Sequence, residues 1–144
     1  MRRVLILLCL VVAPALVAQE KEVLKVPGAV EGLPFSPAIR VGNVIYLSGQ
    51  LGNRIGTREL VPGGITPEAR QTMENIRTVL EAAGSSLDRV FKCTVFLADI
   101  SDYSAMNTVY ASYFSNNPPA RSTVAGSGLA LGARVEIECM ATAP

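Results

Sequence analysis

The order of strand-type and helix-type patterns limits the possible folds of this chain more than any other feature of its sequence. Two segments have the spacing of amphipathic helices, and short segments rich in β-branched and aromatic residues alternate with them. The first two strands are joined by a Gly-Asn turn. This order is typical of an α/β or α+β domain built on one sheet, and right-handed crossovers would place both helices on one face of it. Helices are predicted over 66–83 and from about 102 to 114, and strands over 38–41, 44–48, 90–97, 122–125 and 134–141.

Capping residues support the predicted helix boundaries. Thr66 is suited to cap the first helix, with Pro67 at its first position. Gly84 is suited to end the same helix. Ser101 or Asp102 is suited to cap the second helix, because a short oxygen-bearing side chain can accept a hydrogen bond from a free backbone N–H of the first turn. The two helices are therefore expected to be separate elements with a strand between them.

The last predicted strand alternates apolar and polar residues. Glu136, Glu138 and Met140 share one of its faces, and the opposite face is apolar. Because this mixed face is neither a dry core nor an ordinary solvated surface, we expect it to be the face that the helices leave bare. Copies of the chain would then cover one another, and polar residues would gather in the clefts between them.

The first residues have the composition of a secretory signal. Arg2 and Arg3 form a basic start, 4–13 is apolar, and small residues favour cleavage after Ala18. A membrane anchor is the alternative, but the apolar run is shorter than a spanning helix requires. We therefore expect a secreted or periplasmic protein that has no membrane segment after cleavage. The chain divides into a signal peptide (1–18), an N-terminal tail or edge segment (19–31) and one folded domain (32–144).

The net charge of the chain excludes strongly anionic partners. The chain has 13 basic and 12 acidic residues, and loss of the signal would leave it nearly neutral, so neither nucleic acid nor an anionic membrane is an expected partner.

After export, Cys93 and Cys139 would meet an oxidising compartment, where they could form a disulfide if geometry allows it. Because both fall at apolar positions of predicted strands, we interpret them as small buried thiols.

The absence of histidine excludes whole classes of active site. Ser-His-Asp catalysis, Cys-His catalysis and histidine-ligated metal centres are impossible in this chain. The cysteines are too far apart in sequence for a metal knuckle, and no glycine-rich phosphate loop is present. Any chemistry must come from arginine, carboxylates, hydroxyls, amides and the backbone.

A single arginine stands where a proline-stiffened loop enters a strand near the C-terminus. Arg121 follows Pro-Pro-Ala and precedes Ser-Thr-Val. A guanidinium in a half-buried strand needs an anion, because a carboxylate or phosphate replaces its lost water well. From the residues alone, an ion pair with Glu136 or Glu138 on a neighbouring strand is the simpler interpretation, and an anionic ligand is the other.

Six motifs occur in one order along the chain. They are Leu-Ser-Gly-Gln at 47–50, the helix 72–84, the strand 92–97, Asn107 within 102–113, Pro-Ala-Arg-Ser-Thr at 119–123 and Val-Glu-Ile-Glu at 135–138. Their types and order resemble the RidA (YjgF-like) family of reactive-intermediate deaminases, over about 33–141. The resemblance implies a chorismate-mutase-like α+β fold and a homotrimer with clefts between its subunits. It also implies hydrolysis of 2-imino or enamino acids to 2-oxo acids and ammonia, without metal or other cofactor.

The resemblance also implies roles for individual residues. Arg121 matches the arginine that binds the substrate carboxylate, which a guanidinium can do with two parallel hydrogen bonds. Glu136 matches the carboxylate that orients or activates the attacking water. Ser48 and Asn107 match residues that line the cleft, and the backbone beside Thr123 would supply a second partner for the water. Ser48 could instead only bond backbone at a strand end, and Asn107 could face solvent.

One position departs from the family pattern. Many members have tyrosine in a Gly-Pro-Tyr-Ser segment, whereas this chain has Phe35 in Leu-Pro-Phe-Ser. Phe35 could keep an aromatic wall of the pocket without the hydroxyl, or it could be a core residue. The change leaves a second hypothesis open, in which the chain is a non-catalytic trimeric module that binds ligands or acts as a holdase on the same scaffold.

Overall fold

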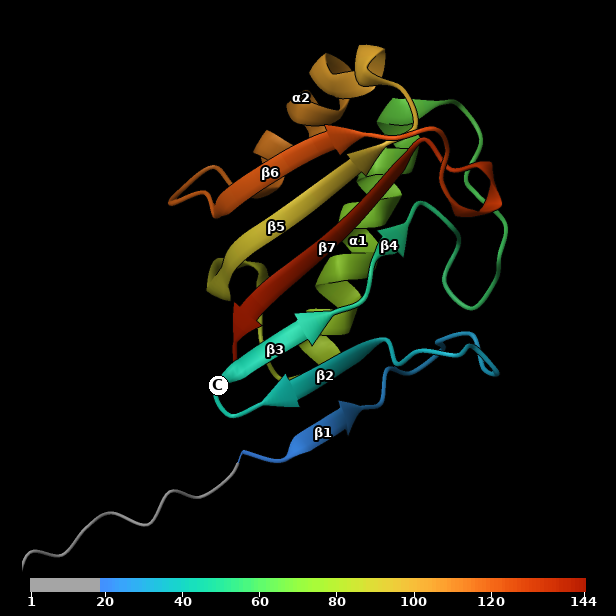
Figure 1. The fold of residues 1–144 in the computed structure, drawn as a ribbon. Coiled ribbons are helices and arrows are strands. Elements are labelled where there is room, and N and C mark those ends of the chain that lie inside the picture. Colours follow the sequence, from blue (N-terminus) through green and yellow to red (C-terminus); the bar gives the residue numbers. More distant parts are fainter. Residues whose placement is uncertain (1–18) are drawn as a thin grey trace, which may run out of the picture.

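Seven strands form one mixed sheet, and both helices lie on the same face of it (Figure 1). In this computed structural model, which describes residues 19–144, the strand order is β1-β2-β3-β7-β5-β6, and β4 pairs with β7. The predicted signal peptide lies outside the described residues. The elements are β1 (Lys21–Leu24), β2 (Ala38–Val41), β3 (Val44–Leu47), β4 (Gln50–Leu51), α1 (Ile65–Ala82), β5 (Val90–Leu97), α2 (Tyr103–Tyr113), β6 (Ala120–Ala125) and β7 (Val135–Thr142).

The predicted hairpin near the start of the domain is confirmed. β2 and β3 pair antiparallel, and Gly42 takes a φ of 58° in the turn between them, a conformation that favours glycine. β1 pairs antiparallel with β2. Part of the segment between 19 and 31 is therefore an edge strand of the sheet.

The first helix begins earlier than its sequence signals predict. Gly64, with a φ of 84°, is the N-cap of α1, and its carbonyl accepts a hydrogen bond from the Glu68 amide at 3.2 Å. The prediction that Thr66 caps this helix is therefore wrong, because glycine allows the chain to turn into the helix before Thr66 is reached. The Glu68 carboxylate is buried and accepts a 2.6 Å hydrogen bond from the Arg134 amide, so it ties the first turn of α1 to the start of β7.

The second helix also starts without the predicted side-chain cap. Asp102 is the N-cap of α2, but its side chain does not bond the helix backbone. Its carboxylate instead accepts two hydrogen bonds from the Arg134 guanidinium, at 2.7 and 2.8 Å. A bidentate pair of charged groups is stronger than a neutral cap, which explains why the carboxylate turns toward β7.

The hydrophobic core lies between the two helices and the sheet. It contains the apolar stripe of α1, including Met73, Ile76 and Leu80, and the inward face of β7, including Val135 and Ile137. The buried residues of α1 follow the helical period, and the buried residues of β7 follow the strand period. Among residues 19–144, no helix combines the length and apolar character needed to cross a membrane.

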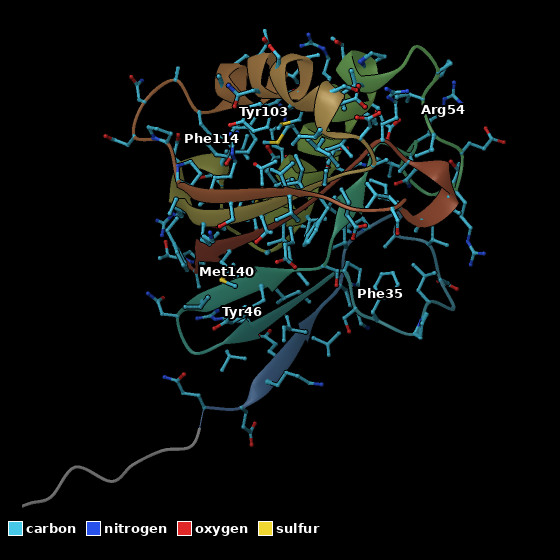
Figure 2. The ribbon with its side chains drawn as sticks, turned by 45° about the horizontal axis from the view of Figure 1, so that its top comes forward. Phe35, Tyr46, Arg54, Tyr103, Phe114 and Met140 are labelled. Atoms are coloured by element: carbon cyan, nitrogen blue, oxygen red, sulfur yellow. A yellow bond between two sulfur atoms is a disulfide. The ribbon has the colours of Figure 1, made fainter. Side chains whose placement is uncertain are left out.

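Residues 19–144 place no helix on the opposite face of the sheet (Figure 1). Glu136, Glu138 and Met140 point to this face from β7, as predicted. Tyr46 on β3 is the register partner of Met140, and the two side chains lie next to each other (Figure 2). Val124 of β6 is also exposed. An uncovered sheet face that carries exposed apolar groups is typical of an interaction surface.

A disulfide joins the two central strands and corrects the interpretation of the cysteines as free thiols. Cys93 on β5 and Cys139 on β7 are register partners, and a bond links their sulfur atoms across a Cα distance of 4.1 Å. Both side chains are buried, with 1% and 2% of their surfaces exposed. Two cysteines directly opposite each other in an antiparallel pair are close enough to bond, which the spacing along the sequence does not reveal.

Candidate functional site

Two tyrosines of α2 support the arginine that the sequence singles out. Arg121 lies on β6 opposite Cys93, so its side chain is on the helix side of the sheet. Its guanidinium carbon lies 4.6 Å from the ring centroid of Tyr110 and 5.8 Å from that of Tyr103. Its Nη2 donates a 3.2 Å hydrogen bond to the Tyr103 hydroxyl. The rings therefore hold the cation through their faces and leave most of its N–H groups available.

No carboxylate neutralises this guanidinium within the part of the chain that the structure describes. The ion pairs of residues 19–144 involve other arginines, and none includes Arg121 at a cutoff of 4.0 Å. The alternative of an internal ion pair with Glu136 or Glu138 is therefore wrong. The reason is topological, because both glutamates point to the opposite face of the sheet.

Asn107 lies on the same side of α2 as the two tyrosines. Tyr103, Asn107 and Tyr110 follow a spacing of four and then three residues, which places them along one helix face. Asn107 is half-buried. This placement is consistent with the predicted cleft-lining role of Asn107, which stays a prediction, and the same spacing in the sequence could have identified the tyrosines as well.

Two buried hydroxyls near the arginine have no hydrogen-bond partner. Thr123 Oγ1 and Tyr110 Oη are inaccessible to solvent, and nothing among residues 19–144 bonds either atom. Burial raises the pKa of Tyr110 to about 12, although the charge of Arg121 acts in the opposite direction. The Tyr110 hydroxyl is therefore protonated at neutral pH and remains a donor. Buried polar atoms without partners are uncommon and are typical of places where a ligand or water binds.

Glu136 belongs to a second group of predicted site residues, and its carboxylate points to the bare face of the sheet. Burial raises the pKa of its carboxyl above the usual value, and the charge of Glu138 raises this pKa further. Gly49 packs against it so closely that a Cβ atom at this position would overlap Glu136 Oε1. A larger residue here would force the Glu136 carboxylate to move.

Ser48 and Phe35 form the other part of this second group. Ser48 Oγ donates a 2.7 Å hydrogen bond to the carbonyl of Ser36, so its hydroxyl fixes the loop that carries Phe35. Ser48 thus makes the backbone bond of the strand-end interpretation and positions that loop, and its cleft-lining role stays a prediction. Phe35 is 55% exposed and lines a cavity together with Gly49, so it is a wall residue and not part of the core.

The two groups do not meet within one chain. Arg121, Asn107 and Thr123 lie on the helix side at the β6 edge, whereas Glu136 points to the bare face. A ligand that contacts both Arg121 and Glu136 would need residues from two copies of the chain.

Comparison with known proteins identifies the family of this chain. The family model described as Endoribonuclease L-PSP matches residues 28–143, which is most of the chain. The chain belongs to this family. A goat member of the L-PSP family, named 2-iminobutanoate/2-iminopropanoate deaminase, is 47% identical over 117 residues, which cover 81% of this chain and 84% of the goat protein.

Solved structures of similar proteins confirm the predicted fold. RidA from the Antarctic bacterium Psychrobacter is 38% identical, with a TM-score of 0.78 over 84% of this chain and 98% of its own. The YjgF gene product of E. coli is 30% identical, with a TM-score of 0.78 over 85% of this chain and 98% of its own. The resemblance to the RidA (YjgF-like) family, with a mixed sheet and two helices on one face, is thereby confirmed.

We expect Tyr103→Phe to weaken substrate binding in this L-PSP family member. The change removes the acceptor for Arg121 Nη2 but keeps the ring, so the guanidinium loses one restraint on its orientation. A hydrogen bond to a charged group at this exposed position contributes about 1 kcal/mol, which predicts a KM for an imino acid raised about fivefold with little change in kcat. Steady-state kinetics measure both parameters.

Tyr113→Phe on the same helix is the matched control for this experiment. It also removes a tyrosine hydroxyl that bonds a charged group, in this case Glu74 Oε1 at 2.7 Å, but it does so away from Arg121. Equal KM values for the two variants would contradict the role assigned to Tyr103.

Proposed function

We propose that this protein hydrolyses 2-imino and enamino acids to 2-oxo acids and ammonia. The observation that carries the proposal is a guanidinium at the sheet edge that is held by aromatic rings and has no carboxylate partner among residues 19–144. An imino acid has a planar carboxylate that matches the donor fork of arginine. The names of relatives such as the goat protein support the same reaction.

The residues around Arg121 and those around Glu136 together supply the chemical functions that imine hydrolysis needs. Arg121 would bind the substrate carboxylate, and Asn107 would line the same cleft. Glu136 accepts a proton from a water molecule while the water oxygen adds to the imine carbon, which gives a carbinolamine. Glu136 then returns this proton to the nitrogen, the C–N bond breaks, and ammonia leaves. As the C–N bond breaks, the hydroxyl proton of the carbinolamine passes through solvent to the departing nitrogen, so the neutral imine and one water give the 2-oxo acid and ammonia.

The placement of these groups supports a homotrimer. Because Arg121 and Glu136 lie on different surfaces of one chain, the contact that joins them pairs two unlike surfaces. Contacts of this kind generate rings when the rotation closes. A ring of three copies would cover the bare faces of the sheets, including Tyr46, Met140 and Val124, and would form three equivalent clefts.

We also propose that the protein is exported to the periplasm or secreted, with cleavage after Ala18. The composition of 1–18 supports export, and the disulfide between Cys93 and Cys139 is suited to an oxidising compartment. N-terminal sequencing of protein isolated from its own cells should begin at Gln19.

The pH dependence of activity should respond to the residue beside the proposed base. Glu136 must be ionised to accept a proton, and the charge of Glu138 raises its pKa. Glu138→Gln removes this charge and lowers the pKa of Glu136, so the acid limb of the pH profile of kcat/KM moves to lower pH. The measurement is a pH series of initial rates. Glu81→Gln, at an exposed position of α1, removes an equal charge far from the site and should leave the limb unchanged.

Ammonia release from an imino acid tests the proposed function directly. An amino-acid oxidase generates the imino acid in place, and the rate of 2-oxo acid formation is compared with and without the full protein. We expect the protein to raise this rate. Unchanged rates, combined with a rise in melting temperature when carboxylate ligands are added, would favour the non-catalytic binding module instead.

A further inference from the structure

A cavity of about 380 Å³ lies next to the second group of site residues. Its walls come from the loop before β2, the ribbon after β4, α1, and the turn at 130–132, and most of its lining side chains are apolar. Its volume is in the range of small-molecule sites. For comparison, an apolar cavity of about 150 Å³ is sufficient to bind benzene.

Three large apolar side chains around this cavity are exposed to solvent. Phe35, Ile55 and Leu131 are 55%, 51% and 54% exposed, and they come from three segments that are distant in the sequence. Scattered exposed apolar residues are normal, but a cluster around one cavity is typical of a ligand site. Phe35 also lacks the hydroxyl that family members often have at this position, so the wall that it provides is entirely apolar.

The backbone of Leu131 gives an independent indication of function. Its φ is 61°, in the left-handed region that favours glycine and that bulky residues rarely adopt. Gly132 follows immediately, so a glycine is available to this turn. A leucine held in this conformation costs stability, and such strain persists where a side chain is needed in one place. Here that place is the wall of the cavity.

The cavity and the proposed base share a neighbour in Gly49. Gly49 lines the cavity and also packs directly against the Glu136 carboxylate, and Phe35 lines the cavity on a loop that Ser48 fixes. A substrate whose imine carbon faces Glu136 would therefore have its carboxylate toward Arg121 of a second copy and its side chain toward the cavity.

We propose that this cavity binds the side chain of the substrate, and that the preferred substrates are imino acids with large apolar side chains, such as those formed from leucine, methionine and phenylalanine. The inference rests on the proposed function. It assigns Phe35, Ile55 and Leu131 as specificity-determining residues. A small side chain would leave the cavity unfilled, so it would gain nothing from these walls.

A substrate series tests this preference. Imino acids are generated by an amino-acid oxidase from alanine, 2-aminobutanoate, leucine, methionine and phenylalanine, and kcat/KM is measured for each. Apolar pockets discriminate by about 10-fold or more for each added methylene that they bind, so we expect kcat/KM for the leucine product to exceed that for the alanine product by at least about 10-fold. Equal values, or a preference for the smallest substrate, would overturn the inference.

Leu131→Gly separates a binding role from a structural one. Glycine relieves the left-handed backbone, so the melting temperature should stay the same or rise. Removal of the side chain from the cavity wall should lower kcat/KM for the leucine product about 10-fold and change the value for the alanine product less than about twofold. Equal losses for both substrates, or loss of the oligomer by size-exclusion chromatography, would show that Leu131 serves assembly and would overturn its assignment.

Thr78→Phe fills the cavity from the side of α1. Thr78 lines the cavity, and its hydroxyl bonds the carbonyl four residues earlier. We expect kcat/KM for the phenylalanine product to fall at least about 10-fold while the alanine product is still hydrolysed. Thr108→Phe is the matched control, because Thr108 is an exposed threonine of α2 with the same type of backbone bond. Similar losses in both variants would overturn the inference.

These experiments distinguish failure of the proposed function from failure of the inference about the cavity. If the proposed function is wrong, no imino acid in the series is hydrolysed faster with the protein than without it. If only the present inference is wrong, the small imino acids are hydrolysed, but neither Leu131→Gly nor Thr78→Phe changes the ratio between large and small substrates.

Discussion

Arg121→Ala should lower kcat/KM for imine hydrolysis by about 100-fold or more. Two charge-assisted hydrogen bonds to the substrate carboxylate contribute about 3 kcal/mol or more, and alanine removes both. Because Arg121 has no carboxylate partner among residues 19–144, its removal leaves no internal charge unpaired and should change the melting temperature little. Arg121→Lys should recover only part of the activity, because an ammonium group lacks the planar donor fork.

A mixing experiment tests whether Arg121 and Glu136 act from different copies of the chain. Glu136→Gln should also be inactive, because the amide cannot accept the proton from water. When the Arg121→Ala and Glu136→Gln proteins are unfolded together and refolded as mixed rings, some clefts receive an intact arginine from one copy and an intact glutamate from the next. Random assembly predicts about a quarter of the wild-type activity.

The control for mixing is each variant refolded alone, which should remain inactive. Full activity of Arg121→Ala alone would contradict the role of this residue in binding the carboxylate. Absence of any recovery in mixed rings that are shown by mass spectrometry to contain both variants would contradict a shared cleft.

Reduction of the disulfide should lower the free energy of unfolding by about 4 kcal/mol. The bond closes a loop with a sequence separation of 46 residues between Cys93 and Cys139, and the chain-entropy model gives about 4 kcal/mol for a loop of this length. For a domain of this size, the change corresponds to a melting temperature lower by about 15 °C. Thermal unfolding with and without a reducing agent, at one protein concentration, measures the shift.

Comparison of reduced wild type with the Cys93→Ala/Cys139→Ala double variant separates the cross-link from packing. Both lack the bond, but only the variant also loses two buried sulfur atoms, so it should be the less stable of the two. Titration of two free thiols in unreduced, denatured protein, together with equal melting temperatures under both conditions, would contradict the disulfide.

Periodic patterns predicted the elements of the fold and the faces that they present. The strands of the β2–β3 hairpin, the boundaries of β5 and the direction of Glu136 and Glu138 all follow from local alternation. The start of α1 did not follow, because Thr66 and Gly64 compete for the cap and the sequence does not show which one the chain turns on.

The site was harder to predict, because its contacts join distant residues. Arg121 was identified from its unusual context, but its support by Tyr103 depends on how the loop before β6 returns along α2. The bond between Cys93 and Cys139 depends on the register of two strands. Glu68 has no sequence signal that distinguishes a buried anchor from an ordinary charge in a first helical turn.

The position of Arg121 and Glu136 on opposite sides of one sheet has a consequence for how long the protein remains active. Under the proposed mechanism, an isolated copy carries every reactive group and can complete no reaction. If the protein is secreted as proposed, dilution outside the cell would favour dissociation of the ring. Activity would then last only as long as the copies stay together.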